Sequence, residues 1–86
     1  MNELTKCLKA AANERRLRIL YELKRHGPLT VNGIAKRIRL SLKSTSKHIQ
    51  KLAECNFIKR EQKSLQVWCT LNRRHPLLQS LLIHVK

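Results

Sequence analysis

The sequence is poor in the residues on which several functional classes depend. It holds one Tyr, one Phe, one Trp and two glycines among 86 residues, so a hydrophobic core must be built mainly from Leu, Ile, Val and Ala. It contains no Gly-rich phosphate loop, paired acidic cluster or nucleophile–base pattern, and we therefore predict that the protein is not an enzyme. No apolar run approaches the roughly 20 residues that a membrane span needs, so no membrane partner is expected.

The three cysteines, Cys7, Cys55 and Cys69, form neither a CxxC pair nor a spacing typical of metal ligands. The N-terminal residues also lack the apolar segment of a secretory signal. An odd number of cysteines in such a chain indicates reduced thiols in a cytoplasm. We expect no cofactor, and Cys69, on the inward side of its predicted strand, should be a small core residue.

Acidic residues are scarce, and this gives the chain a strong positive charge. Five Asp and Glu stand against nineteen Lys and Arg, for a net charge of +14 at pH 7. Such an imbalance destabilises a compact state by self-repulsion, which a polyanionic partner would offset. Nucleic acid is the commonest partner of this kind, because each neutralised phosphate releases counterions. A generally basic protein without such a partner, or one that binds an anionic membrane surface, is the alternative.

Helical periodicity predicts four helices in the first two thirds of the chain. They cover residues 2–12, about 14–25, a short stretch from Val31 to Ile38, and about 42–55. Asn13, Thr30 and Ser41 are the expected N-caps of the second, third and fourth helices. Gly27 and Pro28 end the second helix.

The hydrophobic pattern then changes to a period of two, which is typical of strands. We expect a hairpin of two strands, Phe57–Glu61 and Leu65–Leu71, joined by Gln62-Lys63-Ser64. A last helix should begin at Pro76 and carry a Leu-rich stripe to about residue 85. The predicted fold is mainly α with a small β-hairpin, in the order helix-helix-helix-helix-hairpin-helix. It is a single winged helix-turn-helix domain over residues 1–86.

The third and fourth helices, joined by the tight turn at residues 39–41, form the helix-turn-helix. In such motifs the second helix enters the major groove of DNA. At 100° per residue, Leu42, Thr45, Ile49 and Leu52 lie on one side of this helix and cationic or short polar side chains lie opposite. We expect groove contacts from Lys43, Ser44, Ser46, Lys47 and Gln50, and phosphate contacts from Thr30, Ser41, Lys51, Arg60 and Lys63. His48 either contacts DNA as well or is a partly buried packing residue.

Four segments carry a resemblance to a known family. They are NERRLRIL at residues 13–20, STSKHI at 44–49, NFI at 56–58 and TLN at 70–72. In this order and spacing they resemble the ArsR-type family of winged-helix transcriptional regulators. The resemblance covers nearly the whole chain, from Leu8 to Leu82. MarR-type regulators share the architecture and are the second choice.

The resemblance implies a homodimer in which the first and last helices, about 2–12 and 76–85, form the interface. We expect this interface to contain Leu4, Cys7, Leu8, Leu78, Leu81, Leu82 and Val85. Packing of some leucines of the last helix on the chain's own core is the alternative. A twofold dimer would bind an inverted repeat with half-sites about 34 Å apart.

The metal sites that the resemblance implies are not assembled in this sequence. One such site uses a cysteine pair in the third helix, where residues 29–34 contain neither cysteine nor carboxylate. Another uses Asp, His and Glu on the last helix, where His75 and His84 have no partner acids. We predict no metal site, although a site built by the dimer with Cys7, or a thiol switch, stays open.

We therefore predict a homodimeric transcriptional regulator, a repressor that binds double-stranded DNA in the cytoplasm in association with the nucleoid. No small-molecule effector is evident from the sequence. A nonspecific architectural, chromatin-like DNA-binding protein is one alternative, which the charge of +14 favours. A winged-helix module that binds an acidic protein is another. RNA binding is disfavoured because few aromatic side chains are available to stack on bases.

Overall fold

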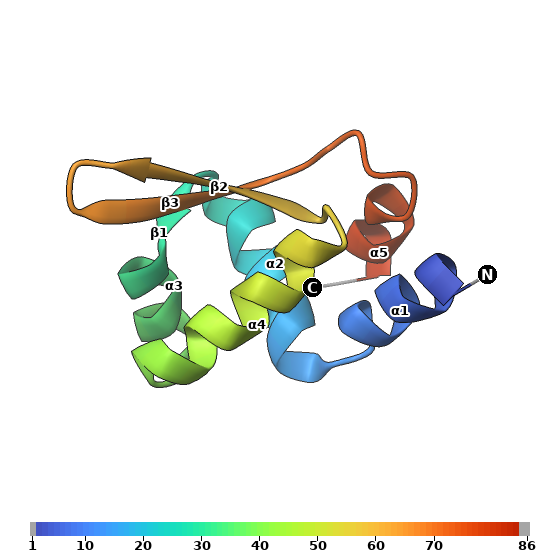
Figure 1. Cartoon of the computed structure of the whole chain (residues 1–86), viewed down its shortest axis with the longest axis horizontal. Helices are drawn as coiled ribbons and strands as arrows, with labels where there is room; N and C mark the ends of the chain where they lie inside the picture. Colours follow the sequence, from blue (N-terminus) through green and yellow to red (C-terminus); the bar gives the residue numbers. More distant parts are fainter. Residues whose placement is uncertain (1, 85–86) are drawn as a thin grey trace.

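The computed structural model describes residues 2–84 of the chain, which form five helices and three short strands (Figure 1). In chain order the elements are α1 (Asn2–Ala11), α2 (Glu14–His26), β1 (Leu29–Thr30), α3 (Val31–Ile38), α4 (Leu42–Glu54), β2 (Ile58–Lys63), β3 (Gln66–Leu71) and α5 (Leu78–His84). The predicted fold class, a mainly helical winged helix-turn-helix with a small sheet, is confirmed. The described helices include none that is long and apolar enough to cross a membrane.

Helix α2 begins and ends where the capping residues predict. The Asn13 side chain accepts a hydrogen bond from the Arg16 amide at 3.1 Å, so it satisfies one of the free N–H groups of the first turn. At the other end, Gly27 adopts a φ of 80°, a conformation that glycine tolerates because it has no Cβ. Its amide donates to the Leu23 carbonyl at 2.9 Å. Pro28 then prevents continuation of the helix.

The helix-turn-helix is formed by α3 and α4, which contact each other directly. Thr30 caps α3 by accepting a hydrogen bond from the Gly33 amide at 3.0 Å. Arg39 ends α3 with a φ of 56°, and its amide donates back to the Lys36 carbonyl. This left-handed residue is what turns the chain sharply into the Ser41 cap of α4.

The sheet differs from the prediction in two ways. A third strand, β1, pairs antiparallel with β3 through Leu29–Cys69 and Thr30–Trp68. A strand of two residues is too short to produce a period-two pattern, so the sequence did not reveal it. The hairpin turn is also shorter than predicted, because positions 62 and 63 belong to β2 and only Ser64 and Leu65 connect the strands.

Leu65 was predicted to be part of the half-buried strand, and this was wrong. It lies in the turn with 97% of its surface exposed. Ser64 before it adopts a φ of 56°, as tight hairpins with a right-handed twist require. The period-two pattern that actually faces the core is therefore shorter and centres on Cys69, which is completely buried.

The hydrophobic core lies between α2, α4, β3 and α5. It is built from aliphatic side chains together with Phe57, whose ring stacks on His75 at a centroid distance of 4.2 Å. Helix α5 begins at Leu78 rather than at Pro76, because residues 76 and 77 form a turn in which the Leu77 amide donates to His75 Nδ1. Similarly, α1 ends at Ala11 instead of residue 12.

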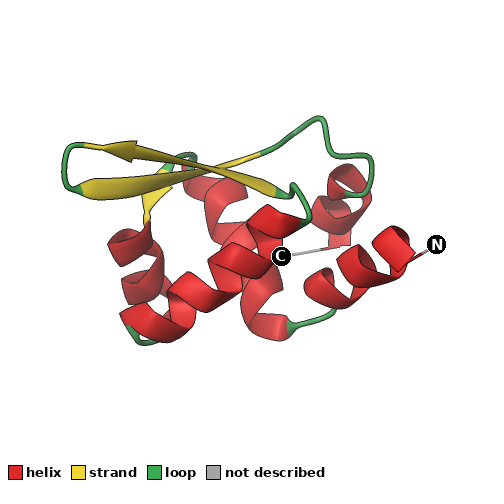
Figure 2. Cartoon of the chain, viewed as in Figure 1, coloured by secondary structure: helices red, strands yellow, loops and turns green. Residues whose placement is uncertain are grey.

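The elements are arranged along the longest axis of the molecule, which measures 37 Å (Figure 1). Helix α3, the first turns of α4 and the β2–β3 turn lie at one end, and α1 and α5 lie at the other. Figure 2 shows the three strands on one side of the helices, with the β2–β3 hairpin extending past them. The fold thus places the helix-turn-helix and the tip of the β2–β3 hairpin, which is the wing, at the end opposite to the terminal helices.

Candidate nucleic-acid interface

Helix α4 presents a polar, cationic face to solvent. Its apolar side is buried at Thr45, Ile49 and Leu52, which are at most 1% exposed. Leu42 was predicted on the same side, but at the start of the helix it is 50% exposed. The predicted groove-contacting residues lie on the other side, where Lys43, Ser46, Lys47 and Gln50 are exposed and Ser44 is partly buried. Lys51 is also exposed on the following turn. The first turn of the helix contains no acidic residue, so nothing in it opposes an incoming phosphate.

Two of the predicted phosphate contacts already have a structural role. The hydroxyl of Ser41 accepts from the Ser44 amide at 3.1 Å, and Thr30 caps α3 in the same way. Ser41 is exposed whereas Thr30 is half-buried between β1 and α3. Each hydroxyl still has a proton to donate, and both lie at helix N-termini, where backbone N–H groups attract anions.

His48 is held by a residue of α2. The Arg16 Nε–H donates to His48 Nδ1 at 3.2 Å, and since guanidinium nitrogens only donate, Nδ1 must be the unprotonated nitrogen. Partial burial, followed by the charges of Arg16 and Arg15, lowers the pKa of His48 below its usual 6.5. The imidazole is therefore neutral at pH 7. It lies half-buried beside the exposed face of α4.

Arg16 was not among the predicted site residues. Besides His48, it binds the last turn of α1, because its Nη1 donates to the Ala10 carbonyl at 3.1 Å. One side chain therefore connects α1, α2 and α4. Its partner His48 is 32 residues away in sequence, and no local pattern signals a contact over that separation.

The wing adds a second cationic surface. Lys59, Arg60 and Lys63 are exposed on β2, and Lys63 forms an ion pair with Glu61 at 3.6 Å. An exposed pair of this kind contributes little stability and is easily exchanged for a phosphate. Trp68 of β3 lies opposite both Glu61 of β2 and Thr30 of β1, so it supports the hairpin at the point where all three strands meet.

A buried carboxylate connects α2 to the helix-turn-helix. Glu22 is 6% exposed and lies 3.6 Å from Arg18, 3.5 Å from His26 and 3.9 Å from Arg37 of α3. Arg37 also lies 2.9 Å from the His26 ring nitrogen. A cluster of charges around one buried acid fixes the position of α3 against α2. The spacing of four residues between Glu22 and both Arg18 and His26 was visible in the sequence, but the burial of Glu22 was not.

The thiols do not form a recognisable ligand set. Burial raises the pKa of Cys69 to about 11, and burial together with the neighbouring Cys7 thiol raises the pKa of Cys55 to about 11. Cys7 is half-buried. Within residues 2–84, no three side chains of His, Cys, Asp or Glu are grouped closely enough to hold a metal ion.

The predicted interface residues divide into two groups. Leu4 and Leu8 of α1 are 43% and 49% exposed, whereas Leu78 and Leu82 of α5 are at most 3% exposed. The assignment of Leu78 and Leu82 to an interface is therefore corrected, since the chain's own core already buries them. Cys7 and Leu81 are half-buried, Ile83 is 73% exposed, and Val85 lies outside the described residues.

Comparisons with known proteins give a consistent result. A model of the MarR family matches residues 12–64, which include α2, α3, α4 and all of β2. Reduced HlyU from Vibrio cholerae N16961 is 29% identical, with 93% of this chain and 85% of that chain covered and a TM-score of 0.77. The ArsR family transcriptional regulator RHA00566 is 26% identical, with coverage of 95% and 84% and a TM-score of 0.79. The transcriptional repressor PagR of Bacillus anthracis is 25% identical, with coverage of 99% and 94% and a TM-score of 0.81. No curated protein matches the sequence.

Proposed function

The chain belongs to the MarR family, and we therefore propose that this DNA-binding regulator acts as a homodimeric, sequence-specific repressor of transcription. The predicted resemblance to ArsR-type and MarR-type winged-helix regulators is confirmed, since the MarR family model matches and an ArsR family regulator is among the similar structures.

The observation that carries the proposal is the exposed face of α4. Lys43, Ser46, Lys47 and Gln50 project from a helix whose opposite side is buried. A major groove about 12 Å wide accommodates one such helix. Lysine can reach guanine or phosphate, and an amide can pair with adenine. The Gln50 amide is 3.3 Å from Glu54, an exposed contact that a base edge can replace.

The wing and the helix caps supply contacts to the DNA backbone. The β2–β3 turn lies at the same end of the molecule as α3 and the start of α4 (Figure 1). Arg60 and Lys63 on the hairpin and the caps Thr30 and Ser41 are therefore our phosphate contacts at this end. Lys51, exposed in the C-terminal half of α4, is a further one. Contacts of this type fix the register of the protein on the duplex without reading its sequence.

A dimer through α1 and α5 would leave this end free. Leu4, Leu8 and Ile83 are the large apolar side chains exposed on these two helices, and both helices lie far from α3 (Figure 1). An isologous dimer would bury them in a self-complementary patch. The two recognition helices would then reach half-sites about 34 Å apart. Repression follows if the occupied operator excludes polymerase, and PagR, which is similar in structure, is itself a transcriptional repressor.

The test is a selection from a random-sequence duplex pool at about 150 mM salt. We expect one inverted repeat to be enriched, with a specificity ratio of roughly 10³ or more over random DNA. Lys47→Gln should weaken binding to that repeat about tenfold. Arg73→Gln removes the same charge from an exposed loop position before α5 and should change the affinity less than twofold. Tight, salt-sensitive binding without an enriched motif would instead establish an architectural DNA-binding protein.

A further inference from the structure

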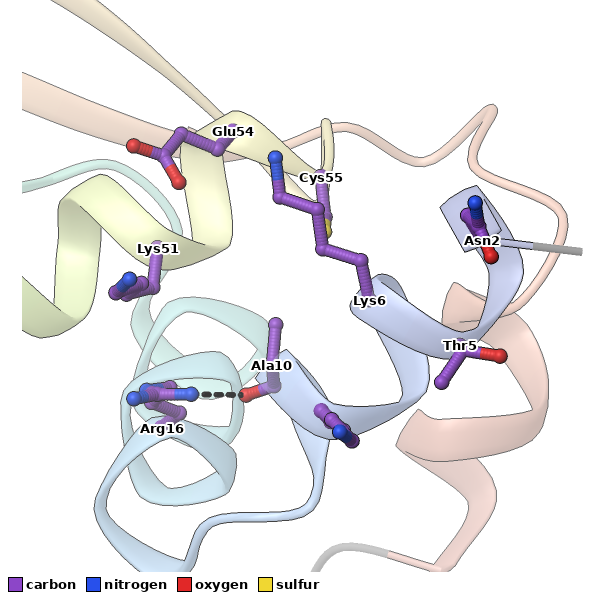
Figure 3. Close-up of a pocket in the computed structure, with 9 residues that line it drawn as sticks. Asn2, Thr5, Lys6, Ala10, Arg16, Lys51, Glu54 and Cys55 are labelled. Carbon is purple, nitrogen blue, oxygen red and sulfur yellow. Dashed lines mark hydrogen bonds between the residues drawn. The ribbon is translucent and has the colours of Figure 1, made fainter.

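A cavity of about 380 Å³ lies between α1, the beginning of α2 and the C-terminal half of α4 (Figure 3). Lys6 and Lys9 of α1, Arg16 of α2 and Lys51 of α4 contribute cationic side chains to its lining. Its volume falls within the range of about 300–1,000 Å³ typical of small-molecule sites. Apart from Lys51, none of the residues that line the cavity has a part in the proposed contact with DNA.

The charges around the cavity are strongly unbalanced. Four cationic side chains line it, and Glu54 is its one acidic residue. The Glu54 carboxylate also accepts a hydrogen bond from Gln50, at 3.3 Å. The cations come from three different helices, so the fold itself brings them together. Such convergence of like charge raises the local concentration of an anionic ligand.

Arg16 is positioned to bind such an anion. The hydrogen bonds to the Ala10 carbonyl and to His48 use two of its donors (Figure 3 shows the first), and a guanidinium carries five N–H groups. These two bonds hold the planar group in place at the inner wall of the cavity. A fixed guanidinium binds carboxylate or phosphate in a bidentate manner at a small entropic cost.

The cavity is separate from the surface that we assign to dimerisation. At 100° per residue, Lys6 and Lys9 lie on the opposite side of α1 from Leu4 and Leu8, roughly 150° around the helix. The apolar residues are exposed, whereas the cavity lies between α1 and α4. A second chain packed on Leu4 and Leu8 would therefore leave the cavity open.

We propose that this cavity binds a small polyanion, a molecule that carries two or more carboxylate or phosphate groups. Several converging cations and one carboxylate favour a ligand with more than one negative charge. The cavity is also lined by Ala10 and by Cys55, so a small apolar body can lie between the charged groups.

Binding would also affect DNA recognition, and this part of the inference rests on the proposed function. Lys51 lies on the recognition helix, and Arg16 holds His48 on the same helix. A bound polyanion would neutralise cations next to α4, Lys51 among them. The loss of positive charge lowers the affinity of α4 for a phosphate backbone, so the ligand would act as an inducer.

The experiment titrates the full chain, without DNA, with citrate and separately with pyrophosphate, at about 150 mM NaCl by calorimetry. We expect saturable binding of one ligand per chain for at least one probe, and the comparison distinguishes a carboxylate from a phosphate preference. Lys6→Gln and Lys9→Gln should each weaken binding about tenfold. Lys36→Gln, at an exposed position in the last turn of α3, is the matched control and should bind within twofold of wild type.

Two results would overturn the proposal. One is that neither probe binds saturably, and the other is that Lys36→Gln weakens binding as much as Lys6→Gln. In a second measurement, the bound probe should raise the Kd for duplex DNA in wild type and have a much smaller effect in Lys6→Gln. The two proposals fail separately: a chain that binds duplex but neither probe lacks this site, and one that binds a probe but no duplex lacks the proposed function.

Discussion

Replacing Thr45 by Val should make the protein more stable. Thr45 lies on the inner side of α4, its side chain is completely buried, and its Oγ1 has no hydrogen-bond partner among the described residues. A buried hydroxyl without a partner loses its bonds to water and gains nothing in return. Valine has nearly the same shape, and it replaces that hydroxyl with a methyl group that suits the surrounding aliphatic core.

The expected gain in the free energy of unfolding depends on the cost of burying a hydroxyl without a partner. An unsatisfied buried polar group costs about 1–3 kcal/mol, and Thr and Val have similar helix propensities. Thr45→Val should therefore increase the free energy of unfolding by about 1–2 kcal/mol. Thr45→Ser is the control. It keeps the hydroxyl and removes the buried methyl group, and it should lower the free energy of unfolding by about 1 kcal/mol.

The measurement is urea unfolding followed by circular dichroism, with all variants at one protein concentration because the proposed dimer would add to the stability. The midpoint should rise for Thr45→Val and fall for Thr45→Ser, with unchanged slopes. Affinity for DNA should stay the same, since Thr45 faces away from the exposed surface of α4. A Thr45→Val midpoint equal to or below that of wild type would show that the hydroxyl has a partner, and the reasoning would be wrong.

Three further outcomes follow from the charged and titratable groups. Glu22→Gln should lower the free energy of unfolding by about 1–2 kcal/mol, because the ion pairs with Arg18 and Arg37 are lost and the contact with His26 is weakened; an unchanged urea midpoint would contradict this. Burial keeps the Cys69 pKa near 11 in the folded chain against 9.0 when unfolded, so stability should decrease as the pH rises from about 9 to 11, and Cys69→Ala should reduce that slope in thermal melts. The lowered pKa of His48 gives the opposite pH dependence: stability should decrease as the pH falls below 6.5. A His48→Gln variant whose stability has the same acid dependence would exclude this residue as the cause.

The helices could be predicted because their signals are local. Asn13, Thr30 and Ser41 are short polar side chains directly before helical patterns, and all three cap a helix as expected. The buried side of α4 followed from its period of 3.6 residues. Errors occurred where tertiary contacts decide. A two-residue strand such as β1 exists only because β3 lies beside it, and the exposure of Leu65 depends on where the turn falls.

The candidate site was predictable to a similar extent. The exposed positions of α4 follow from the buried ones, so periodicity identified Lys43, Ser46, Lys47 and Gln50. Periodicity could not show that Arg16 reaches His48 across 32 residues, or that Glu22 is buried and contacts Arg37 of α3. It also could not assign the leucines of α5 to core or interface, because a Leu-rich stripe is compatible with both.

The few acidic residues explain how a chain of charge +14 can fold and still present an unopposed cationic surface. There are five acids, and four of them lie where helix or sheet structure uses them. Glu3 and Glu14 are in the first turns of α1 and α2, where they favour the helix dipole. Glu22 is buried and pairs with Arg18 of α2 and Arg37 of α3, and Glu61 pairs with Lys63 within the wing. The first turns of α4 are left without a negative charge. The phosphate groups of DNA would therefore supply the counterions for the exposed cationic face of this helix.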